Sequence, residues 1–472
     1  MPKNKQIHFV GIKGVGMTPL AIIAKEAGFA VSGCDIEREF ITDEILKKAK
    51  ISPLVGFSKE HLRGKDLIIT TGAHGGFSNE EILEAKKLNI PVWSQGQAIG
   101  EFMKGDIFKR KFKGISIAGS HGKTTTTGMI ATILKEANLD PSYLIGTSSL
   151  PSLEYPGHYG KGEYFVAEAD EYVIDPVSDR TPKFLCQQPE IAVFTNIEFD
   201  HPDIYESLEE VKIAFLKFAN QLGQKSLLIA NGDDKQIQEI LKNYSGNKIT
   251  FGFSSDNDYV LKRLGIRDTQ TFFWVDSRKS SLGEFTIQVG GEHNAFNALA
   301  AIATCLEIGL SKEAVRKGLL HFKGSKRRFE YLGKTTRGAL IYDDYAHHPT
   351  EIKKSLEAIR QMYPKFKLIC IFQPHTYSRT KKLFEQFSDS FTSANQVIFM
   401  DIYSSLREKD DPSVSSSKLT QSTNEKSGNA IFLPQPQDVI EYVEQKRFGG
   451  DTIIVTMGAG DVYETGYKLV KI

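Results

Sequence analysis

The segment Gly119-Ser120-His121-Gly122-Lys123-Thr124 constrains the fold more than any other stretch of the chain. An apolar run at 113–118, typical of a strand, precedes it, and residues 128–136 after it have helical spacing. A strand, a glycine turn, Lys-Thr and a helix form the layout of a phosphate-binding loop, in which backbone N–H groups and an open helix end face an anion. Lys123 would add charge at the outer phosphates, and Thr124 would offer a hydroxyl to Mg²⁺.

The loop departs from the full pattern G-x-x-x-x-G-K-[ST], because Ile117 stands where the first glycine would be. Taken alone, the short form fits either a nucleotide site or a glycine turn with a solvated lysine. The rest of the chain has to decide between these two interpretations.

Composition indicates a globular protein of about three domains. The chain has 472 residues, 40% hydrophobic and 25% charged. A net charge of +1 argues against bulk electrostatic binding of nucleic acid or acidic membrane. No apolar run approaches the roughly 20 residues needed to span a bilayer, and no apolar signal segment precedes the first strand. The four cysteines form no CxxC pair and suggest a reducing cytosol. We therefore expect a cytoplasmic monomer or homodimer, with no nucleic-acid partner and no membrane insertion.

The N-terminus has a βαβ pattern. An apolar strand at 6–10 leads into the turn 11–17, a helix to about Ala27, and a second strand at 29–34 that ends at Asp35. The glycines are spaced G-x-x-G-x-G and not G-x-G-x-x-G. The functional interpretation is a pyrophosphate at the helix start and a sugar near Asp35; the alternative is a tight turn and an ordinary polar strand end.

Two central strands end in polar clusters. The apolar run 164–167 leads into Glu168-Ala169-Asp170-Glu171, and the run 191–195 leads into 196–203, which contains His201. Parallel sheets bind ligands at the carboxyl ends of their strands, so these clusters should meet the phosphate loop. An acid beside such a loop usually holds Mg²⁺, which prefers oxygen ligands.

The stretch 247–289 has short alternating segments and predicts a small antiparallel appendage. Asn294 and Asn297 follow it, three residues apart at the start of an Ala-rich helix, so they share one face. Two amides on one face can read a purine edge, but they can equally cap and pack the helix.

Four strand patterns of the last third, at 339–342, 368–372, 396–400 and 452–456, again end in polar residues. Six of the 11 histidines lie in the polar clusters of the chain, which favours one shared site: His121, His201, His293, His347, His348 and His375. The segment 410–428, rich in Ser, Asp and Lys, is predicted to be a loop or a weakly ordered connection.

The predicted fold class is α/β with three domains. Residues 1–107 form a Rossmann-like domain, and residues 108–322 a central P-loop mononucleotide-binding parallel sheet with the small β appendage. Residues 323–472 form a C-terminal Rossmann-like α/β domain that completes the site.

The motifs, taken together, resemble those of the Mur ligases, which are ATP-dependent amide-bond-forming enzymes of peptidoglycan synthesis. The matches run in order over nearly the whole chain: Gly-Ser-His-Gly-Lys-Thr-Thr-Thr, Glu-Ala-Asp-Glu, Thr-Asn-Ile-Glu-Phe-Asp-His, Gly-Glu-His-Asn-Ala-Phe-Asn-Ala, Arg-Arg-Phe and Asp-Asp-Tyr-Ala-His-His-Pro. Two departures are Lys13, where a small residue is usual in the glycine turn, and Tyr172-Val173, where many members have Ser-Asp. Lys13 could clash with the nucleotide pyrophosphate or add charge to it.

The resemblance implies that L-alanine is joined to the carboxylate of UDP-N-acetylmuramate through an acyl phosphate. The implied alternative amine is a tripeptide, as in muropeptide recycling. The implied cofactors are ATP and two Mg²⁺ ions, with Mn²⁺ expected to be able to substitute.

The resemblance also implies roles for individual residues. The residues implied in catalysis are Lys123, Glu171, His201, Arg328 and His348. The implied metal ligands are Thr124, Glu171 and His201, with Glu168 behind them. The implied ATP contacts are Gly119, Ser120, His121, Gly122, Lys123, Thr124, Thr125, Asn294, Asn297, Arg328 and Asp344. The implied substrate contacts are Gly11, Gly14, Gly16, Met17 and Asp35 for the nucleotide sugar, and His348, His375 and Arg379 for the amino acid.

Two other classes of protein remain as alternatives. An NAD-dependent oxidoreductase would explain the N-terminal βαβ pattern, but not Lys123, Thr124 or the acidic and histidine-rich strand ends. A non-catalytic nucleotide switch would explain the loop, but would leave the C-terminal His and Arg cluster without a purpose.

Overall fold

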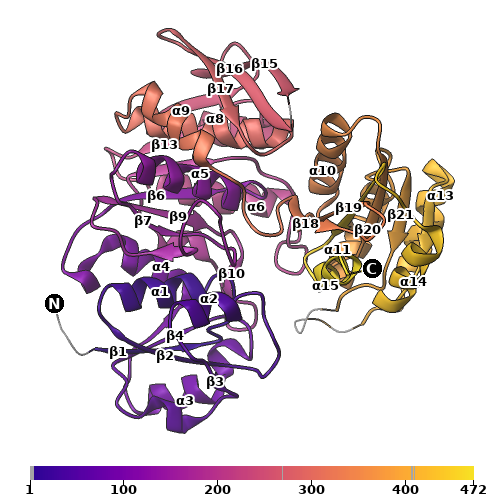
Figure 1. Cartoon of the computed structure of the whole chain (residues 1–472). Helices are drawn as coiled ribbons and strands as arrows, with labels where there is room; N and C mark the ends of the chain where they lie inside the picture. Colours follow the sequence, from indigo (N-terminus) through magenta and orange to yellow (C-terminus); the bar gives the residue numbers. More distant parts are fainter. Residues whose placement is uncertain (1–4, 268, 405–407, 409, 472) are drawn as a thin grey trace.

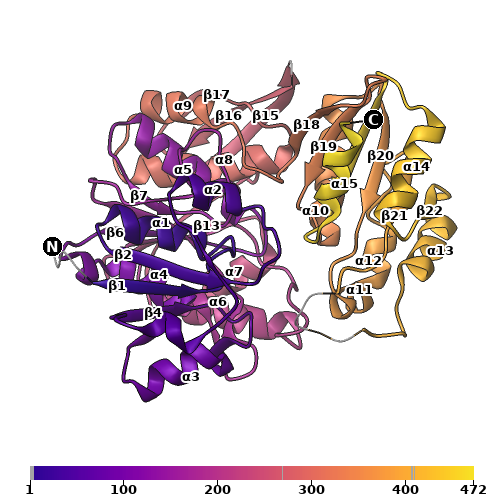
Figure 2. The ribbon, with the colours of Figure 1, turned by 60° about the horizontal axis from the view of Figure 1, so that its bottom comes forward.

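The structure, a computed structural model, describes residues 5–267, 269–404, 408 and 410–471. It confirms the α/β fold class, with three parts that are each built on a separate sheet (Figure 1). In the views of Figures 1 and 2, the C-terminal part stands as a lobe beside the other two. None of the helices in the described ranges has the length and apolar character needed to cross a bilayer.

The N-terminal sheet has five parallel strands in the order β3-β2-β1-β4-β5. The order reverses between β1 and β4, and open α/β sheets bind ligands at such a switch point. The predicted strand–turn–helix–strand start is confirmed. The elements are β1 Gln6–Val10, α1 Thr18–Glu26, β2 Ala30–Asp35, α2 Asp43–Lys48, β3 Leu54–Val55, η1 Lys59–Leu62, β4 Leu67–Thr70, η2 Gly76–Ser78, α3 Glu80–Lys87, β5 Val92–Ser94, α4 Gln95–Lys104 and η3 Asp106–Phe108.

The central sheet has ten strands in the order β17-β16-β15-β14-β13-β12-β6-β9-β7-β8. The strand before the phosphate loop, β6, lies between β12 and β9 and is parallel to both. The elements are β6 Lys113–Ala118, α5 Lys123–Glu136, β7 Ser142–Leu144, β8 Gly157–His158, β9 Tyr164–Ala169, β10 Val173–Asp175, β11 Asp179–Pro182, η4 Lys183–Cys186, β12 Ile191–Phe194, α6 Leu208–Asn220, β13 Leu227–Asn231, α7 Lys235–Asn243, β14 Asn247–Gly252, β15 Tyr259–Arg267, β16 Gln270–Ser277, β17 Ser281–Ile287, α8 Glu292–Glu307 and α9 Lys312–His321.

The predicted β appendage is continuous with this sheet. Strand β14 pairs parallel with β13, and β15 pairs parallel with β14. Within the appendage, the β15–β16–β17 meander is antiparallel. The meander therefore extends one edge of the nucleotide-binding sheet and packs on α8 and α9 through a shared apolar core.

The C-terminal sheet has six strands in the order β18-β19-β23-β20-β21-β22, parallel except for the β18–β19 pair. Its predicted strands are confirmed. The elements are β18 Glu330–Lys334, β19 Leu340–Asp344, α10 Pro349–Met362, β20 Lys367–Phe372, α11 Tyr377–Lys382, α12 Phe384–Ser388, β21 Gln396–Phe399, α13 Ser416–Ser427, β22 Ala430–Phe432, α14 Pro436–Lys446, β23 Thr452–Met457 and α15 Val462–Leu469.

The prediction of a loop over 410–428 is wrong, because α13 fills most of it. Ser415 caps the helix by accepting a hydrogen bond from the Lys418 N–H, and Gly428 ends it in the left-handed conformation. Leu419 and Thr423 are fully buried. Serine is a weak helix former, so the composition of this segment predicts a loop. The helix is stabilised instead by its two caps and by the burial of one face.

Candidate active site

The phosphate loop lies where β6 ends and α5 begins. Two of its glycines are required by close approach and by positive φ. Gly119 has a φ of 146° and Gly122 a φ of 84°, and a Cβ would collide with Thr195 at the first and with Asn297 at the second. Only glycine lets the backbone pass so close to β12 and α8.

The end of β12 holds the loop in place. Asn196 accepts hydrogen bonds from Ser120 N (3.0 Å, to its carbonyl) and from His121 N (2.9 Å, to Oδ1). Within the described chain, no side chain caps the first turn of α5. The N-terminal N–H groups of this 14-residue helix therefore remain available to an anion, as the sequence predicts.

Lys123 lies inside an acidic pocket at this helix start. Its Nζ is 2.9 Å from Glu171 Oε2 and 2.5 Å from the Gly119 carbonyl oxygen. Burial alone would lower the pKa of Lys123, but Glu171 and Asp170 raise it above its ordinary value. The ammonium is therefore charged at every physiological pH and is aimed at the phosphate loop.

The acidic strand end and His201 meet beside Lys123, as predicted. Asp170, Glu171 and His201 each offer a ligand atom within 4.8 Å of the others, and His201 Nε2 is 3.8 Å from Glu171 Oε1. The third predicted metal ligand, Thr124, bonds instead to Glu168 Oε2 at 3.0 Å. The structure thus brings two of the three predicted ligands together and adds Asp170, which the sequence prediction left out.

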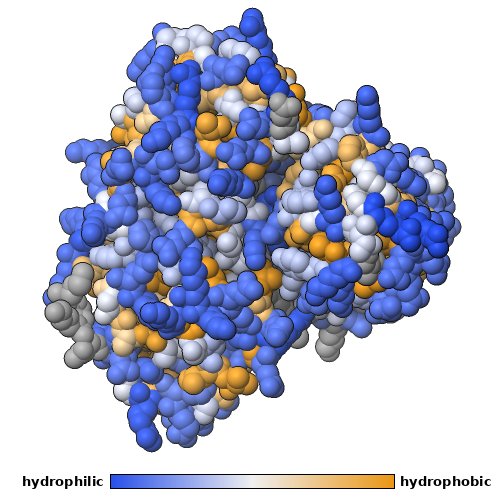
Figure 3. Space-filling model, in the orientation of Figure 1, coloured by the Kyte–Doolittle hydropathy of each residue, from blue (hydrophilic) through white to orange (hydrophobic). Residues whose placement is uncertain are grey.

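A cleft of about 390 Å³ opens between the central sheet and the C-terminal lobe. A hollow between these two parts is visible in Figure 3. Asn294 and Asn297 line it next to His121, Gly122 and Thr125. The Asn294 amide also donates to the Gly290 carbonyl at 2.7 Å, so both sequence interpretations of this pair have support.

Aromatic side chains that the sequence prediction missed lie in the same cleft. The rings of Phe253 and Phe296 stack with centroids 5.3 Å apart and an interplanar angle of 28°. Phe253 follows β14, and Phe296 lies on α8 between the two asparagines. Flat apolar faces beside amide groups suit a purine base.

The C-terminal lobe supplies the opposite wall of the cleft. Arg328, Asp344 and Glu351 face the phosphate loop, and His121 Nδ1 is 3.2 Å from Glu351 Oε1. Burial alone would lower the pKa of His121, but Glu351 and Glu198 raise it to about 10. Arg328 Nη1 is also 3.4 Å from Glu351 Oε1. The Glu351 carboxylate therefore contacts both His121 and Arg328, two of the predicted ATP-binding residues.

His348 stands at the junction of the two parts as the N-cap of α10. Its ring is 4.8 Å from that of His121, and its Nδ1 is 3.5 Å from Glu198 Oε2. Its Nε2 is buried and has no hydrogen-bond partner among the described residues. A buried polar atom without a partner is costly, which makes this nitrogen a candidate for contact with a ligand.

Arg379 and His375 lie next to this junction, and both bond to other protein side chains. The Arg379 guanidinium donates to Asp200 Oδ1 at 2.7 and 3.1 Å, and its Nη1 is 3.3 Å from His375 Nδ1. His347 also belongs here, with its ring 6.2 Å from that of His375. Together with His293, which lines the cleft, and His201, the six histidines gather around the two strand ends and the facing lobe.

The N-terminal glycine turn is formed as predicted, but two of its predicted substrate contacts are buried. Gly11 has a φ of 78°, and a Cβ there would lie 2.6 Å from Thr71. Asp35 has no exposed surface, because its carboxylate accepts hydrogen bonds from the N–H groups of Lys13 and Ile36, both at 2.8 Å. Met17 is buried in the core under the turn. In this structure the Asp35 side chain supports the turn and Met17 packs beneath it. All five residues, Gly11, Gly14, Gly16, Met17 and Asp35, stay predicted contacts of the nucleotide sugar.

The Lys13 side chain is bonded to residues outside the glycine turn. Its Nζ donates to the Arg38 carbonyl at 2.9 Å and is 3.3 Å from Asp43. The unusual residue therefore ties the glycine turn to the segment 36–43.

Glu198, Asp200 and Glu351 are the main functional candidates that the sequence prediction missed. Glu198 and Asp200 flank Phe199 within a motif already identified, and Glu351 follows His348 by three residues. Burial opposes their ionisation, but histidine and arginine partners lower the pKa of Glu198 to about 2 and hold those of Asp200 and Glu351 well below the usual range. Their positions within or near identified motifs gave a signal. The partners Arg379 of Asp200 and His121 of Glu351 come from the opposite lobe, whereas Glu198 has partners in both parts, His121 and His348.

Comparisons with known proteins fit this geometry. Residues 6–106 match the "Mur ligase family, catalytic domain", residues 117–305 the "Mur ligase middle domain", and residues 327–460 the "Mur ligase, glutamate ligase domain". These matches cover most of the described chain. The chain belongs to the Mur ligase family, and the predicted resemblance is confirmed.

Particular members of the family are similar over the whole length. The chain is 39% identical over 465 residues to the UDP-N-acetylmuramate–L-alanine ligase of Desulfitobacterium hafniense (strain Y51), covering 98% of this chain and 99% of the relative. The structure of the present chain matches that of UDP-N-acetylmuramate–alanine ligase from Thermotoga maritima with a TM-score of 0.81, at 26% identity over 98% of each chain. A murein peptide ligase from Psychrobacter arcticus shares the fold, with a TM-score of 0.70 and 23% identity over 99% of this chain and 98% of that one.

Proposed function

We propose that this Mur ligase uses ATP to join L-alanine to the carboxylate of UDP-N-acetylmuramate in peptidoglycan precursor synthesis. One observation carries the proposal: the uncapped phosphate loop, through His121, Gly122 and Thr125, and the C-terminal lobe, through Arg328, Asp344 and Glu351, line one interlobe cleft. The 39% identity to a ligase of that name over nearly the whole chain supports the choice of substrates.

A carboxylate does not react with an amine in water, because its leaving group is too poor. Transfer of the γ-phosphoryl group of ATP to the muramate carboxylate gives an acyl phosphate and ADP. The amine nitrogen then attacks the acyl carbon through a tetrahedral intermediate, the C–O bond to phosphate breaks, and the amine proton is released to water. Positioning and charge stabilisation supply most of the rate in such reactions.

Charged side chains in and beside the cleft suit these two steps. Lys123 and the open start of α5 would hold the transferred phosphate, and Arg328 would approach it from the other lobe. The unpartnered Nε2 of His348 would donate to, or accept from, the reacting acyl group or the amino acid. Phe253, Phe296, Asn294 and Asn297 would hold the adenine base, and Asp344 the ribose.

The acidic end of β9 suits Mg²⁺, because its side chains are oxygen donors next to the loop lysine. Glu171 and His201 would hold a metal ion with Asp170, and Thr124 would join them by turning away from Glu168. A bound ion would neutralise charge on the phosphate oxygens. Two ions, and replacement by Mn²⁺, remain part of this proposal.

Two finer points complete the proposal. We assign nucleotide-sugar binding to residues 1–107, ATP binding to 108–322, and completion of the ATP and amino-acid sites to 323–472. All four cysteines are free, which agrees with a reducing cytoplasm, and we propose a monomer or homodimer there.

The test is ADP release by the purified chain with ATP, Mg²⁺ and UDP-N-acetylmuramate in the presence of single amines. L-alanine should stimulate ADP release more than glycine, L-serine or the tripeptide L-Ala-γ-D-Glu-meso-diaminopimelate, and the product should gain the mass of alanine less water. Preference for the tripeptide would mean that the chain is a muropeptide-recycling ligase and not an L-alanine ligase. Stimulation by none of the amines would refute the ligase proposal.

A further inference from the structure

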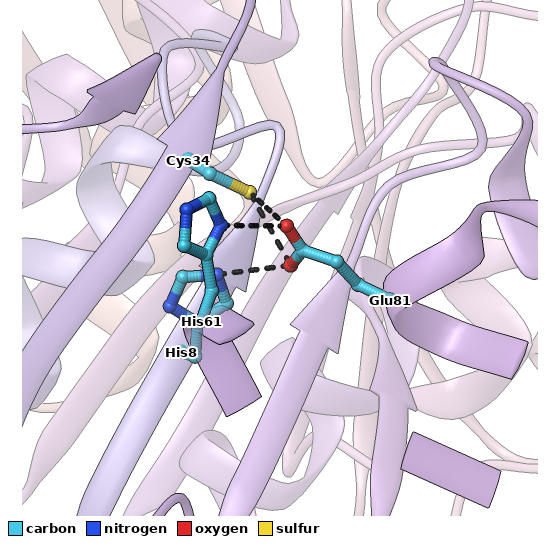
Figure 4. A group of neighbouring side chains, drawn as sticks. All are labelled: His8, Cys34, His61 and Glu81. Atoms are coloured by element: carbon cyan, nitrogen blue, oxygen red, sulfur yellow. Dashed lines mark hydrogen bonds and ion pairs between the residues drawn. The ribbon is translucent and has the colours of Figure 1, made fainter. Parts of the chain in front are cut away.

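A second group of metal-binding side chain types lies away from the interlobe cleft, inside the N-terminal sheet domain. His8 on β1, Cys34 on β2, His61 on η1 and Glu81 on α3 turn their polar atoms toward one another (Figure 4). One ligand atom of each residue lies within 4.8 Å of the others. His8, Cys34 and Glu81 have no exposed surface, whereas the His61 side chain is 15% exposed.

The Glu81 carboxylate is the centre of this group. His8 Nε2 is 3.1 Å from its Oε2, His61 Nδ1 is 2.8 Å from its Oε1, and Cys34 Sγ is 3.3 Å from Oε1. Two imidazole nitrogens, a thiol and a carboxylate therefore converge on one small volume from four different elements.

Neighbouring groups hold the ligand atoms in this orientation. The other ring nitrogen of His8, Nδ1, is 2.9 Å from Ser32 Oγ, which leaves Nε2 facing the group. The backbone N–H of Ser58 donates to Glu81 Oε1 at 2.8 Å. Metal-binding histidines and carboxylates usually have such a second partner behind them.

We propose that His8, Cys34, His61 and Glu81 form a binding site for a tetrahedral divalent transition-metal ion, with zinc as the preferred ion. Zinc takes Cys, His and carboxylate ligands at about 2.0–2.3 Å, which places the ligand atoms roughly 3.3–3.7 Å apart. The observed contacts to Glu81, at 3.1 Å from His8 and 3.3 Å from Cys34, and the 4.8 Å limit on all separations in the group are close to that spacing. Thiol and imidazole ligands disfavour Mg²⁺ and Ca²⁺, which prefer oxygen.

Charge balance supports an ion in this place. Glu81 is fully buried, and the partners of its carboxylate are hydrogen-bonding groups, with no lysine or arginine among them in the described residues. A divalent cation would give this buried carboxylate a charged partner. A Zn²⁺ ion held by the Glu81 carboxylate, a Cys34 thiolate and two neutral imidazoles would bring the group to a net charge of zero. Its entry route is the partly exposed side of His61.

A metal ion here would fix the strands that carry the glycine turn. His8 is three residues before Gly11, and Cys34 directly precedes Asp35, which holds the N–H of Lys13. The ion would therefore stabilise the N-terminal domain and its turn, and the proposal does not depend on which reaction the interlobe site catalyses.

Cobalt substitution tests the site, because Co²⁺ bound to a thiolate gives a near-ultraviolet charge-transfer band. The described residues form two other groups that could hold a metal ion, and neither contains a cysteine. The full chain, stripped of metal with a chelator and titrated with Co²⁺, should develop the band and visible tetrahedral bands at one equivalent. Zn²⁺ should abolish them and raise the melting temperature.

Cys34→Ser should remove the band, and His61→Ala should weaken Co²⁺ binding at least tenfold. Cys186→Ser, at a cysteine outside the group, is the matched control and should keep the band. Circular dichroism establishes that each variant is folded. Absence of the band from the wild-type chain, or its survival in folded Cys34→Ser, would overturn the proposal whatever the other variants do.

Discussion

At the scale of single residues, the first prediction concerns Lys123, the lysine of the phosphate loop. It is 2.9 Å from Glu171, which is only 2% exposed, so its removal leaves a buried carboxylate without its cation. We expect Lys123→Met to lower kcat for ADP release by about 10²–10³-fold, the usual cost of losing one group that stabilises transition-state charge. Lys135→Met, at a lysine of the same helix that bonds the Ser152 carbonyl at 3.0 Å, is the control and should keep near wild-type turnover.

Asp344 makes a second prediction at this scale, about pH. Burial raises its pKa from 3.8 to about 6. An acid with a raised native pKa binds its proton more tightly when folded, so its contribution to the unfolding free energy falls as pH rises from about 4 to about 6. With about 1.4 kcal/mol for each pKa unit, we expect Asp344→Asn to gain about 1–3 kcal/mol on the wild type between pH 4 and pH 7.

Thermal unfolding of Asp344→Asn and wild type across this pH range measures the difference. Asp256→Asn, at an exposed aspartate, controls for the loss of one negative charge. A difference between wild type and Asp344→Asn that stays constant with pH would contradict the raised pKa.

At the scale of secondary structure, α13 depends on its ends. Ser415 accepts from the Lys418 N–H at 3.3 Å, and the helix body is rich in Ser and Thr, which have modest helix propensity. Ser415→Ala should destabilise the helix by about 0.5–2 kcal/mol. Hydrogen exchange of the α13 amides should accelerate, while that of β20 and β23 stays unchanged. Ser417→Ala, at an exposed position inside the helix, should slow exchange slightly or leave it as it is.

Elements with an apolar run were predictable from the sequence, and α13 was not. β6, β12 and β23 are buried over nearly their whole length and are mostly apolar in sequence. In α13 the buried positions include Ser416, Thr420 and Thr423, and the hydroxyl of Thr420 bonds the Ser416 carbonyl four residues back. Such a local hydrogen bond allows a hydroxyl side chain to be buried in a helix. A prediction based on residue polarity alone therefore misses α13.

The candidate site was predictable to a similar extent. Lys123, Glu171 and His201 follow strands, so their convergence could be inferred from sheet topology. Asp200 and Glu351 could not be assigned, because the partners that define them, Arg379 and His121, come from the other lobe. Asp35 and Met17 were assigned from their motif, and the burial of their side chains could not be inferred from it.

At the scale of the whole molecule, the C-terminal lobe is held to the central part by buried charges. Arg379 and Asp200 are each 5% exposed, Thr350 Oγ donates to Glu198 at 2.6 Å, and Glu351 pairs with His121. Truncating one partner of a buried pair costs about 3–5 kcal/mol, because the other charge is left unpaired. We therefore expect Arg379→Met to open the interlobe cleft and increase the radius of gyration in small-angle scattering.

Asp200→Asn separates this role from binding of the amino acid. Both variants should open the molecule if the pair holds the lobes together. If Arg379 also binds the carboxylate of L-alanine, Arg379→Met should raise the KM for L-alanine further than Asp200→Asn does. Unchanged scattering for both variants would contradict the role of the pair in closure.

The N-terminal part touches the C-terminal lobe through a weaker contact. Arg38 donates to Tyr403 Oη at 3.2 Å and lies 3.3 Å from Asp461, but the Arg38 and Asp461 side chains are 49% and 36% exposed. Exposed pairs contribute about 0.2–1 kcal/mol and weaken with salt. Because Lys13 holds the Arg38 carbonyl, this contact connects the glycine turn directly to the C-terminal lobe.

We therefore expect Arg38→Ala to raise the KM for UDP-N-acetylmuramate by no more than about fivefold, with little change in kcat. The effect should fade as ionic strength rises, whereas the effect of Arg379→Met should persist, because buried pairs are screened less. Arg63→Ala, at an exposed arginine of the same domain, should leave both constants unchanged. A salt-independent loss of kcat in Arg38→Ala would mean that Arg38 acts on the reacting groups and not on the contact between the two lobes.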